Sequence, residues 1–94
     1  MASESLARLH LLITGRVQGV FFRASAANQA RSLGIRGFAC NLAEGSVEIV
    51  AEGARSSLEL LRAWAERGPA HAEVDSVEAE WGDFKGEFSE FRIR

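Results

Sequence analysis

The sequence predicts a small α+β domain that combines one antiparallel sheet with two helices. Its 94 residues are about the length of one domain. With 47% hydrophobic and 26% charged residues, the composition is typical of a globular protein and argues against intrinsic disorder. Segments in which every second residue is apolar alternate with two segments of helical spacing. No linker, repeat or low-complexity segment interrupts the chain, so we expect residues 1–94 to form a single domain.

The first half of the chain predicts a strand, a helix and a hairpin. Apolar and polar residues alternate over 6–14, which is typical of a strand. Apolar residues then recur at helical spacing over 22–33, and Gly34 follows where the end of a helix favours a left-handed residue. Strands over 35–42 and 46–52 are expected to form a hairpin, because a glycine-containing turn joins them.

The second half predicts one more helix and one more long strand. Ser56 and Glu59 have the spacing of a capping box that would open the helix, and the Gly-Pro pair at 68–69 ends it. Residues 73–81 predict a strand, and 88–93 predict a short final one. The order strand, helix, strand, strand, helix, strand (βαββαβ) is the split βαβ pattern of ferredoxin-like folds. Such a sandwich places both helices on one face of an antiparallel sheet, and right-handed crossovers leave one strand between the two strands of each βαβ unit.

Charge is distributed unevenly along the sequence. Residues 1–43 hold five arginines and one acid, whereas residues 44–94 hold six basic residues and twelve acids. The halves therefore carry +4 and −6, which sum to the net charge of −2. An anionic ligand would be attracted to the first half, although folding can mix the two halves in space.

Several classes of protein are disfavoured by what the sequence lacks. A single cysteine, Cys40, excludes an internal disulfide and a cysteine-based zinc cluster, and points to a reducing cytoplasm. No apolar run approaches the roughly 20 residues of a membrane span, and no signal-peptide pattern opens the chain. The negative net charge, and the absence of base-stacking aromatic residues from the strands at 9–13 and 47–51, argue against a nucleic-acid partner. We therefore expect a cytoplasmic protein, with a monomer as the default state.

The segment GRVQGVFFR at 15–23 carries the clearest chemical signal. It joins the first strand to the first helix, where backbone N–H groups lack intrahelical partners and can form an anion-binding nest. Gly15 and Gly19 permit tight turns and a close approach of a ligand to the backbone. Arg23 in the first helical turn would add a two-pronged donor that matches phosphate oxygens. Taken alone, the segment fits an anion site and a plain connection equally well.

The same segment resembles the acylphosphatase signature G-x-V-Q-G-V-x-F-R, and all seven fixed positions match. The stretch GIRGFACNLAEGSVE at 34–48 is similar to a second block of that family, which contains an asparagine, a hairpin glycine and Val-Glu. The Gly-Pro break at 68–69, the strand at 72–77 and the closing residues 91–94 are similar as well. The resemblance covers nearly the whole chain in the right order.

The resemblance implies hydrolysis of acyl phosphates to a carboxylate and inorganic phosphate, with inorganic phosphate as product and inhibitor. Carried over by position, it makes Arg23 the phosphate-binding arginine and Asn41 the residue that orients the attacking water. The backbone amides of the loop would form the phosphate cradle together with Arg23; these residues are Arg16, Val17, Gln18, Gly19 and Val20. The chain departs from the family at Phe38, where tryptophan is more frequent, at Ala39 and Cys40, which replace a common Val-Arg pair, and at Ala26, where threonine is frequent.

Other phosphatase chemistries fail on spacing. Six positions after Cys40 comes Ser46, where a cysteine-nucleophile phosphatase needs arginine. The only lysine, Lys85, precedes a glycine, so no P-loop is present, and neither Asp75 nor Asp83 sits in a paired-aspartate motif. We expect no cofactor and no metal, because acyl phosphate hydrolysis needs neither and no clustered ligand set is visible. A non-catalytic module that senses phosphate or an acyl phosphate is the alternative.

The remaining polar and aromatic candidates receive ordinary structural interpretations. His10 is expected to be a surface or satisfied histidine, and Cys40 a packed or half-buried thiol beside the site. Trp64 falls in the apolar stripe of the second helix and is expected in the core. Phe21 and Phe22 are expected to pack beneath the loop rather than to stack on a ligand. His71 is likewise expected to be a surface or satisfied histidine. Arg16 is expected either to steer anions or to be a solvated charge.

Overall fold

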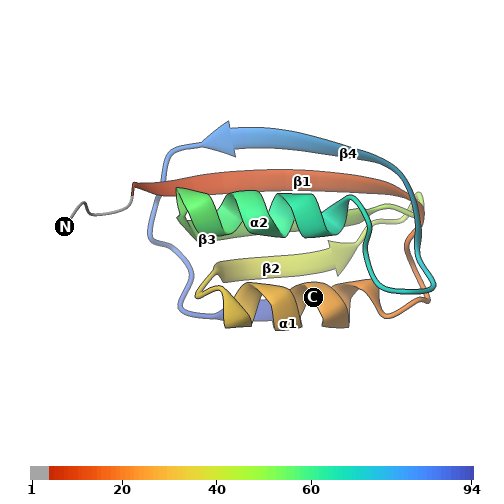
Figure 1. Ribbon diagram of the computed structural model, residues 1–94. Coiled ribbons are helices and arrows are strands. Elements are labelled where there is room, and N and C mark those ends of the chain that lie inside the picture. The colour runs from red at the N-terminus through yellow and green to blue at the C-terminus, as the bar shows by residue number, and fades with distance from the viewer. Residues whose placement is uncertain (1–4) are drawn as a thin grey trace.

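The computed structural model describes residues 5–94 and contains one five-stranded sheet with two helices. Both helices lie on the same face of the sheet (Figure 1). In chain order the elements are β1 (Leu6–Arg16), α1 (Phe22–Ser32), β2 (Arg36–Asn41), β3 (Val47–Ala54), α2 (Arg55–Ala65), β4 (Glu73–Gly82) and β5 (Phe91–Ile93). This is the ferredoxin-like α+β fold that the sequence predicts.

The strand order is β4-β1-β3-β2-β5. The strands β1 and β2 both pair antiparallel with β3, and β3 and β4 both pair antiparallel with β1. Each βαβ unit therefore encloses one strand, as the crossover rule predicts. The short strand β5 differs, because it pairs parallel with β2 and makes the whole sheet mixed. The connection 83–90 carries the chain across the sheet, so β5 enters in the same direction as β2.

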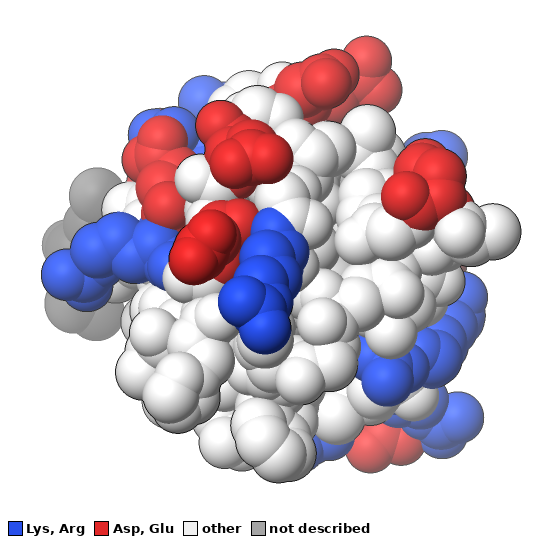
Figure 2. All heavy atoms as spheres, turned by 90° about the vertical axis from the view of Figure 1, so that its right-hand side faces the viewer, with Lys and Arg blue, Asp and Glu red and all other residues white. Residues whose placement is uncertain are grey.

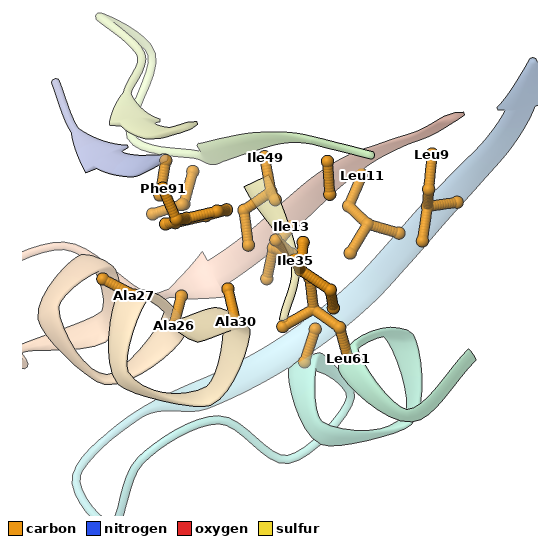
Figure 3. Packing of buried hydrophobic residues seen from close by; sticks show 14 of the residues in the cluster. Leu9, Leu11, Ile13, Ala26, Ala27, Ala30, Ile35, Ile49, Leu61 and Phe91 are labelled. Atoms are coloured by element: carbon orange, nitrogen blue, oxygen red, sulfur yellow. The ribbon is translucent and has the colours of Figure 1, made fainter. Parts of the chain in front are cut away.

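The core lies between the sheet and the helices. Every second residue of β1 is buried, and these residues face the two helices (Figure 3). The small side chains of α1 let this helix lie close to the sheet, while α2 contributes larger leucines. Among the fully buried core residues are Leu9, Leu11, Ile13, Ala26, Ala27, Ala30, Ile49, Leu58 and Leu61.

The helix α2 begins two residues earlier than the capping box predicts. Its N-cap is Ala54, which makes no side-chain capping bond, so Ser56 lies inside the first turn. The strand β3 runs straight into α2, and the N–H of Arg55 donates to the main-chain oxygen of Ser5 at 2.9 Å. A main-chain oxygen thus replaces one side-chain cap. Glu59 instead pairs with arginines one turn away on either side, with N–O distances of 3.8 and 3.4 Å.

The face of the sheet opposite the helices carries a buried carboxylate. Glu52 is only 2% exposed and accepts backbone N–H bonds from Lys85, Gly86 and Glu87 at 2.7, 3.1 and 3.3 Å. The Nη1 of Arg8 also donates to Oε2 of Glu52 at 3.1 Å. Glu52 therefore fixes the connection 83–90 to the middle of the sheet. Within residues 5–94, neither helix is long and apolar enough to cross a membrane.

Candidate active site

The loop between β1 and α1 begins at a glycine that the sheet itself requires. The pairing of β1 with β4 shifts between Thr14 and Gly15, and Gly15 has φ +124°. A Cβ on Gly15 would lie 2.2 Å from the main-chain oxygen of Glu73 in β4. Position 15 must therefore be glycine, because the main chain of β4 occupies the space that a side chain would need. The prediction that Gly15 admits a ligand to the backbone is wrong for this reason.

Gly19 has the open surroundings that the sequence analysis assigned to both glycines. Its φ is +75°, and a Cβ built there meets no atom within 4 Å. A ligand can therefore approach the main chain at Gly19 without displacing a side chain.

A cavity of about 350 Å³ brings the two predicted catalytic side chains together. Arg23 reaches it from the first turn of α1, and Asn41 from the last residue of β2. Both lie at the end of the molecule where the β1–α1 loop and the β2–β3 hairpin meet, on the right in Figure 1. The complete lining is Val17, Gly19, Phe21, Phe22, Arg23, Ala24, Asn41 and Ile93.

Two arginines of α1 are held by the last strand. The guanidinium of Arg23 donates from Nη1 to the main-chain oxygen of Arg94 at 2.7 Å. Arg31, farther along the same helix, donates from Nη2 and Nε to the main-chain oxygen of Phe91 at 2.9 and 3.3 Å. The side chain of Arg94 lies over the ring of Phe38, with its Cζ 3.9 Å from the ring centroid. The main chain just after β5 thus orients Arg23, whereas β5 itself holds Arg31.

Asn41 lies at the rim of the sheet on its helix side. It pairs with Val47 across the hairpin and has the same orientation as Ala39, which is fully buried. Asn41 itself is exposed. Asn41 lines the cavity, and within the described part of the chain its side-chain amide makes no hydrogen bond, so its donor and its acceptor are not used by the protein.

Gln18 joins the loop to the hairpin that carries Asn41. Its Nε2 donates to the main-chain oxygens of Leu42 and Ser46 at 2.8 and 2.9 Å. The same two residues close the hairpin, because the N–H of Leu42 donates to the oxygen of Ser46 at 2.8 Å. Sequence reasoning assigned only the backbone amide of Gln18 and missed this role of the side chain. The fixed glutamine of the motif was the available signal.

The other predicted cradle residues are divided between two cavities. Val17 and Gly19 line the cavity of Arg23 and Asn41, whereas Arg16 and Val20 line a neighbouring cavity of about 430 Å³. Gly19 belongs to both. Arg16 is exposed and lines this second cavity together with His71 and Glu73. The rest of its lining is Phe21, Ala70 and Ala72. Arg16 therefore lines a different cavity from Arg23, although the two cavities share Gly19 and Phe21.

Charges of both signs surround the site. Figure 2 looks onto this end of the molecule and shows basic and acidic side chains around a broad uncharged surface. The basic first half and acidic second half of the sequence are partly mixed by folding, because Arg8 pairs with Glu52 and Glu87 across the sheet. Neither Arg16 nor Arg23 takes part in an ion pair within residues 5–94. Within the described residues, no side-chain carboxylate therefore neutralises either cation.

Comparison with known proteins shows the family of this chain. The family model described as Acylphosphatase matches residues 9–93. This chain belongs to the acylphosphatase family. An acylphosphatase of Anaeromyxobacter sp. (strain Fw109-5) is 48% identical over 89 residues, which cover 95% of this chain and 96% of the relative.

Solved acylphosphatase structures have the same fold. The acylphosphatase from Coxiella burnetii superposes with a TM-score of 0.91 at 38% identity and full coverage of both chains. The acylphosphatase from Bacillus subtilis gives a TM-score of 0.90 at 27% identity, covering 96% of this chain and 99% of the other. The predicted acylphosphatase resemblance is thereby confirmed.

The two aromatic residues of the acylphosphatase signature segment have opposite environments. Phe22 is 2% exposed, and its ring packs against that of Trp64 with a centroid distance of 5.2 Å. Phe21 is 79% exposed, so the expectation that it packs beneath the loop is wrong. Its left-handed backbone, with φ 62° and ψ 27°, turns the side chain out of the core.

Cys40 and His10 meet at one carboxylate on the opposite face of the sheet. The thiol donates to Glu48 at 3.5 Å, and His10 Nε2 lies 2.7 Å from the other oxygen of Glu48. Burial raises the pKa of Cys40, and Glu48 raises it further, whereas the charges of Arg94 and Arg23 work in the other direction. The bond with His10 lowers the pKa of Glu48 below its ordinary value against the opposing effect of burial. Cys40 is therefore a protonated structural thiol in this acylphosphatase fold.

No group of three or more His, Cys, Asp or Glu residues in the described range 5–94 is arranged to hold a metal ion. The acidic residues nearest the two predicted catalytic side chains also stay outside their cavity, whose described lining contains no Asp, Glu or His. The polar chemistry of the cavity therefore comes from one guanidinium, one carboxamide and the loop backbone.

Proposed function

We propose that this acylphosphatase hydrolyses acyl phosphates in the cavity shared by Arg23 and Asn41. Arg23 and the backbone amides of residues 16–20 bind the phosphoryl group, and Asn41 holds the attacking water. The observation that carries this proposal is the convergence of Arg23 and Asn41, from α1 and β2, on one cavity beside an open Gly19.

The groups in the cavity suit the reaction. An acyl phosphate is a mixed anhydride whose carboxylate leaves as a weak base, so its departure needs little help from a general acid. The transition state needs compensation of charge on the phosphoryl oxygens and an aligned water. Arg23 provides fixed positive charge, and the amide of Asn41 offers both an acceptor and donors to a water molecule.

A phosphoryl oxygen of the substrate accepts the proton of the attacking water in this proposal. Support comes from the cavity itself, because Asp, Glu and His are missing from its lining within residues 5–94. The water attacks phosphorus, the bond from phosphorus to the bridging oxygen breaks, and the electron pair leaves on the carboxylate. Inorganic phosphate remains on Arg23 and the loop, so it is expected to compete with the substrate.

The deciding experiment measures release of phosphate from acetyl phosphate by the wild-type chain in the presence of EDTA. Turnover well above the rate of spontaneous hydrolysis is expected, together with competitive inhibition by inorganic phosphate. Binding of phosphate without turnover would favour the alternative, a module that senses phosphate or an acyl phosphate. A strict requirement for a divalent metal would contradict the mechanism proposed here.

A cytoplasmic monomer without nucleic-acid or membrane partners is the proposed working form. The free thiol of Cys40 suits a reducing compartment. The exposed large hydrophobic residues come from several different elements. Sedimentation at several protein concentrations would test the monomer, and cell fractionation would test the location.

A further inference from the structure

Phe21 has a conformation and an exposure that folding alone does not favour. It is the only non-glycine residue in the range 5–94 with a positive φ. A bulky L-residue in this left-handed region is strained, and glycine or asparagine would be preferred there. Because 79% of its surface is exposed, the ring also gains little from burial. An aromatic side chain at this position therefore calls for a role other than stability.

The ring stands at the mouth of the cavity that contains Arg23 and Asn41. Phe21 is the N-cap residue of α1, two residues after Gly19 and two before Arg23. It lines both the cavity of Arg23 and the neighbouring cavity of Arg16. Phe21 is therefore placed beside any group that extends from a phosphate bound at Arg23.

Ile93 provides a second exposed apolar side chain in the same cavity. It is 45% exposed and pairs with Ala39 in β2, so it lies on the helix side of the sheet, as Asn41 does. Phe21 and Ile93 are two of the five large hydrophobic residues that are exposed in the described chain, and both line this one cavity. Ala24 adds a small apolar contact from α1.

The cavity is larger than a phosphate group requires. Its volume of about 350 Å³ corresponds to roughly ten water molecules at about 30 Å³ each. A phosphate has five heavy atoms and is held at the polar side by Arg23. The remaining space is bounded mainly by apolar side chains, so it suits an apolar substituent next to the phosphate.

We propose that Phe21 and Ile93 form the binding wall for the acyl group, and that the enzyme prefers acyl phosphates with a ring-sized or branched apolar acyl group. This inference rests on the proposed function, because it needs the phosphoryl group at Arg23. The acyl carbon is then one bridging oxygen from phosphorus, and its substituent lies against the ring of Phe21. An acetyl group is too small to cover either side chain.

The test compares kcat/KM for benzoyl phosphate and acetyl phosphate in the wild type and in Phe21→Asn. Asparagine tolerates the left-handed backbone but removes the apolar ring. We expect the ratio of the two kcat/KM values to fall about tenfold or more in Phe21→Asn, because loss of a modest apolar contact has about that effect. Ile93→Ser should shift the ratio in the same direction, and Phe21→Leu should retain part of the preference.

A matched control removes an equally exposed apolar residue elsewhere. Leu60 on α2 is 59% exposed and lines a different cavity with Trp64. Leu60→Asn should leave the ratio unchanged. The melting temperature should rise by a few degrees in Phe21→Asn, since strain is relieved, so a loss of preference cannot be assigned to unfolding.

The possible failures separate the two proposals. If the wild type hydrolyses neither substrate, the proposed function fails and this inference fails with it. If the wild type hydrolyses both but Phe21→Asn lowers the two kcat/KM values equally or leaves their ratio unchanged, only the acyl wall is refuted. Phe21 would then shape the phosphate loop without touching the acyl group.

Discussion

The Nη1 of Arg23 is held 2.7 Å from the main-chain oxygen of Arg94, so the residue that follows β5 sets the direction of the predicted phosphate-binding guanidinium. One Nη1 bond to the backbone leaves the remaining N–H donors of the fork for a ligand. Arg31 makes the corresponding bond to Phe91 from farther along α1 but does not line the cavity. Comparing variants of the two arginines therefore distinguishes the anchoring of the C-terminal segment, to which both contribute, from the binding of phosphate, which is expected of Arg23 alone.

We expect Arg23→Ala to weaken inhibition by phosphate and to lower turnover together, the latter by about a hundredfold or more. The guanidinium holds the phosphoryl group before the reaction and while its charge redistributes. Arg31→Ala should lower the melting temperature without weakening phosphate inhibition. Kinetics and thermal unfolding of both variants test this, and equal effects on phosphate inhibition would contradict the role of Arg23.

Asn41→Ala should abolish most of the turnover while phosphate still competes at nearly its original concentration. Loss of one polar group that acts chiefly in the transition state costs about 2.7–4 kcal/mol, or roughly a hundred- to a thousandfold in rate. Asn41 is exposed, and its side-chain amide makes no hydrogen bond within residues 5–94. The loss of this amide should therefore change the melting temperature little. Near-normal turnover in Asn41→Ala would make it a turn residue only.

Gln18→Ala should destabilise the protein and lower turnover through the position of Asn41. Two neutral hydrogen bonds at about 1 kcal/mol each are lost, and this corresponds to a fall in Tm of roughly 8–16 °C for a domain of this size. A double-mutant cycle on kcat gives the sharper readout. In the Asn41→Ala background, Gln18→Ala should have little further effect on kcat, whereas independent roles would make the two losses multiply.

The stability contributed by Glu52 should disappear in acid. Burial works to raise the pKa of this carboxyl, but the N–H of Lys85, the Arg8 guanidinium and the N–H of Glu87 outweigh it, and the net pKa lies below the ordinary value of 4.5. A lowered pKa in the folded state stabilises the protein above about pH 4.5, and this contribution is lost as the pH falls through the folded-state pKa. Stability should therefore decline from pH 5 downward.

Glu52→Gln provides the control for this pH dependence. At neutral pH it should cost about 1.5–3 kcal/mol, since the charged acceptor of the bonds from Arg8 and the main-chain N–H groups is lost while Arg8 keeps its pair with Glu87. Urea unfolding at a series of pH values should show the difference between wild type and Glu52→Gln shrinking in acid. A constant difference down to pH 3 would contradict the assignment to ionised Glu52.

Local periodicity was sufficient to predict the elements of the fold. Alternation over 6–14 and helical spacing over 22–33 both correspond to observed elements, because one buried face dominates each. The start of α2 was predicted two residues late, since the oxygen that meets its first N–H comes from Ser5, which is distant in sequence. The parallel pairing of β5 was missed for a similar reason, because it depends on where the connection 83–90 crosses the sheet.

The candidate site was predictable to the extent that it is carried by a linear motif. Arg23 and Asn41 were selected by resemblance, and the structure places both at one cavity. The bonds from Gln18 to the hairpin depend on two segments meeting in space, so spacing alone does not reveal them. Phe21 and Phe22 are adjacent and chemically identical, and only the left-handed backbone at Phe21 distinguishes the exposed ring from the buried one.

Glu52 recognises main-chain amides of the connection 83–90 and none of its side chains. These bonds do not depend on the side chains of residues 85–87, but each needs its N–H group, and a proline at any of them would remove a donor. Glu87 and Phe88 are more constrained, because Glu87 pairs with Arg8 and the ring of Phe88 packs against Phe38. Lys85 is thus the permissive position of this segment for a fluorescent label.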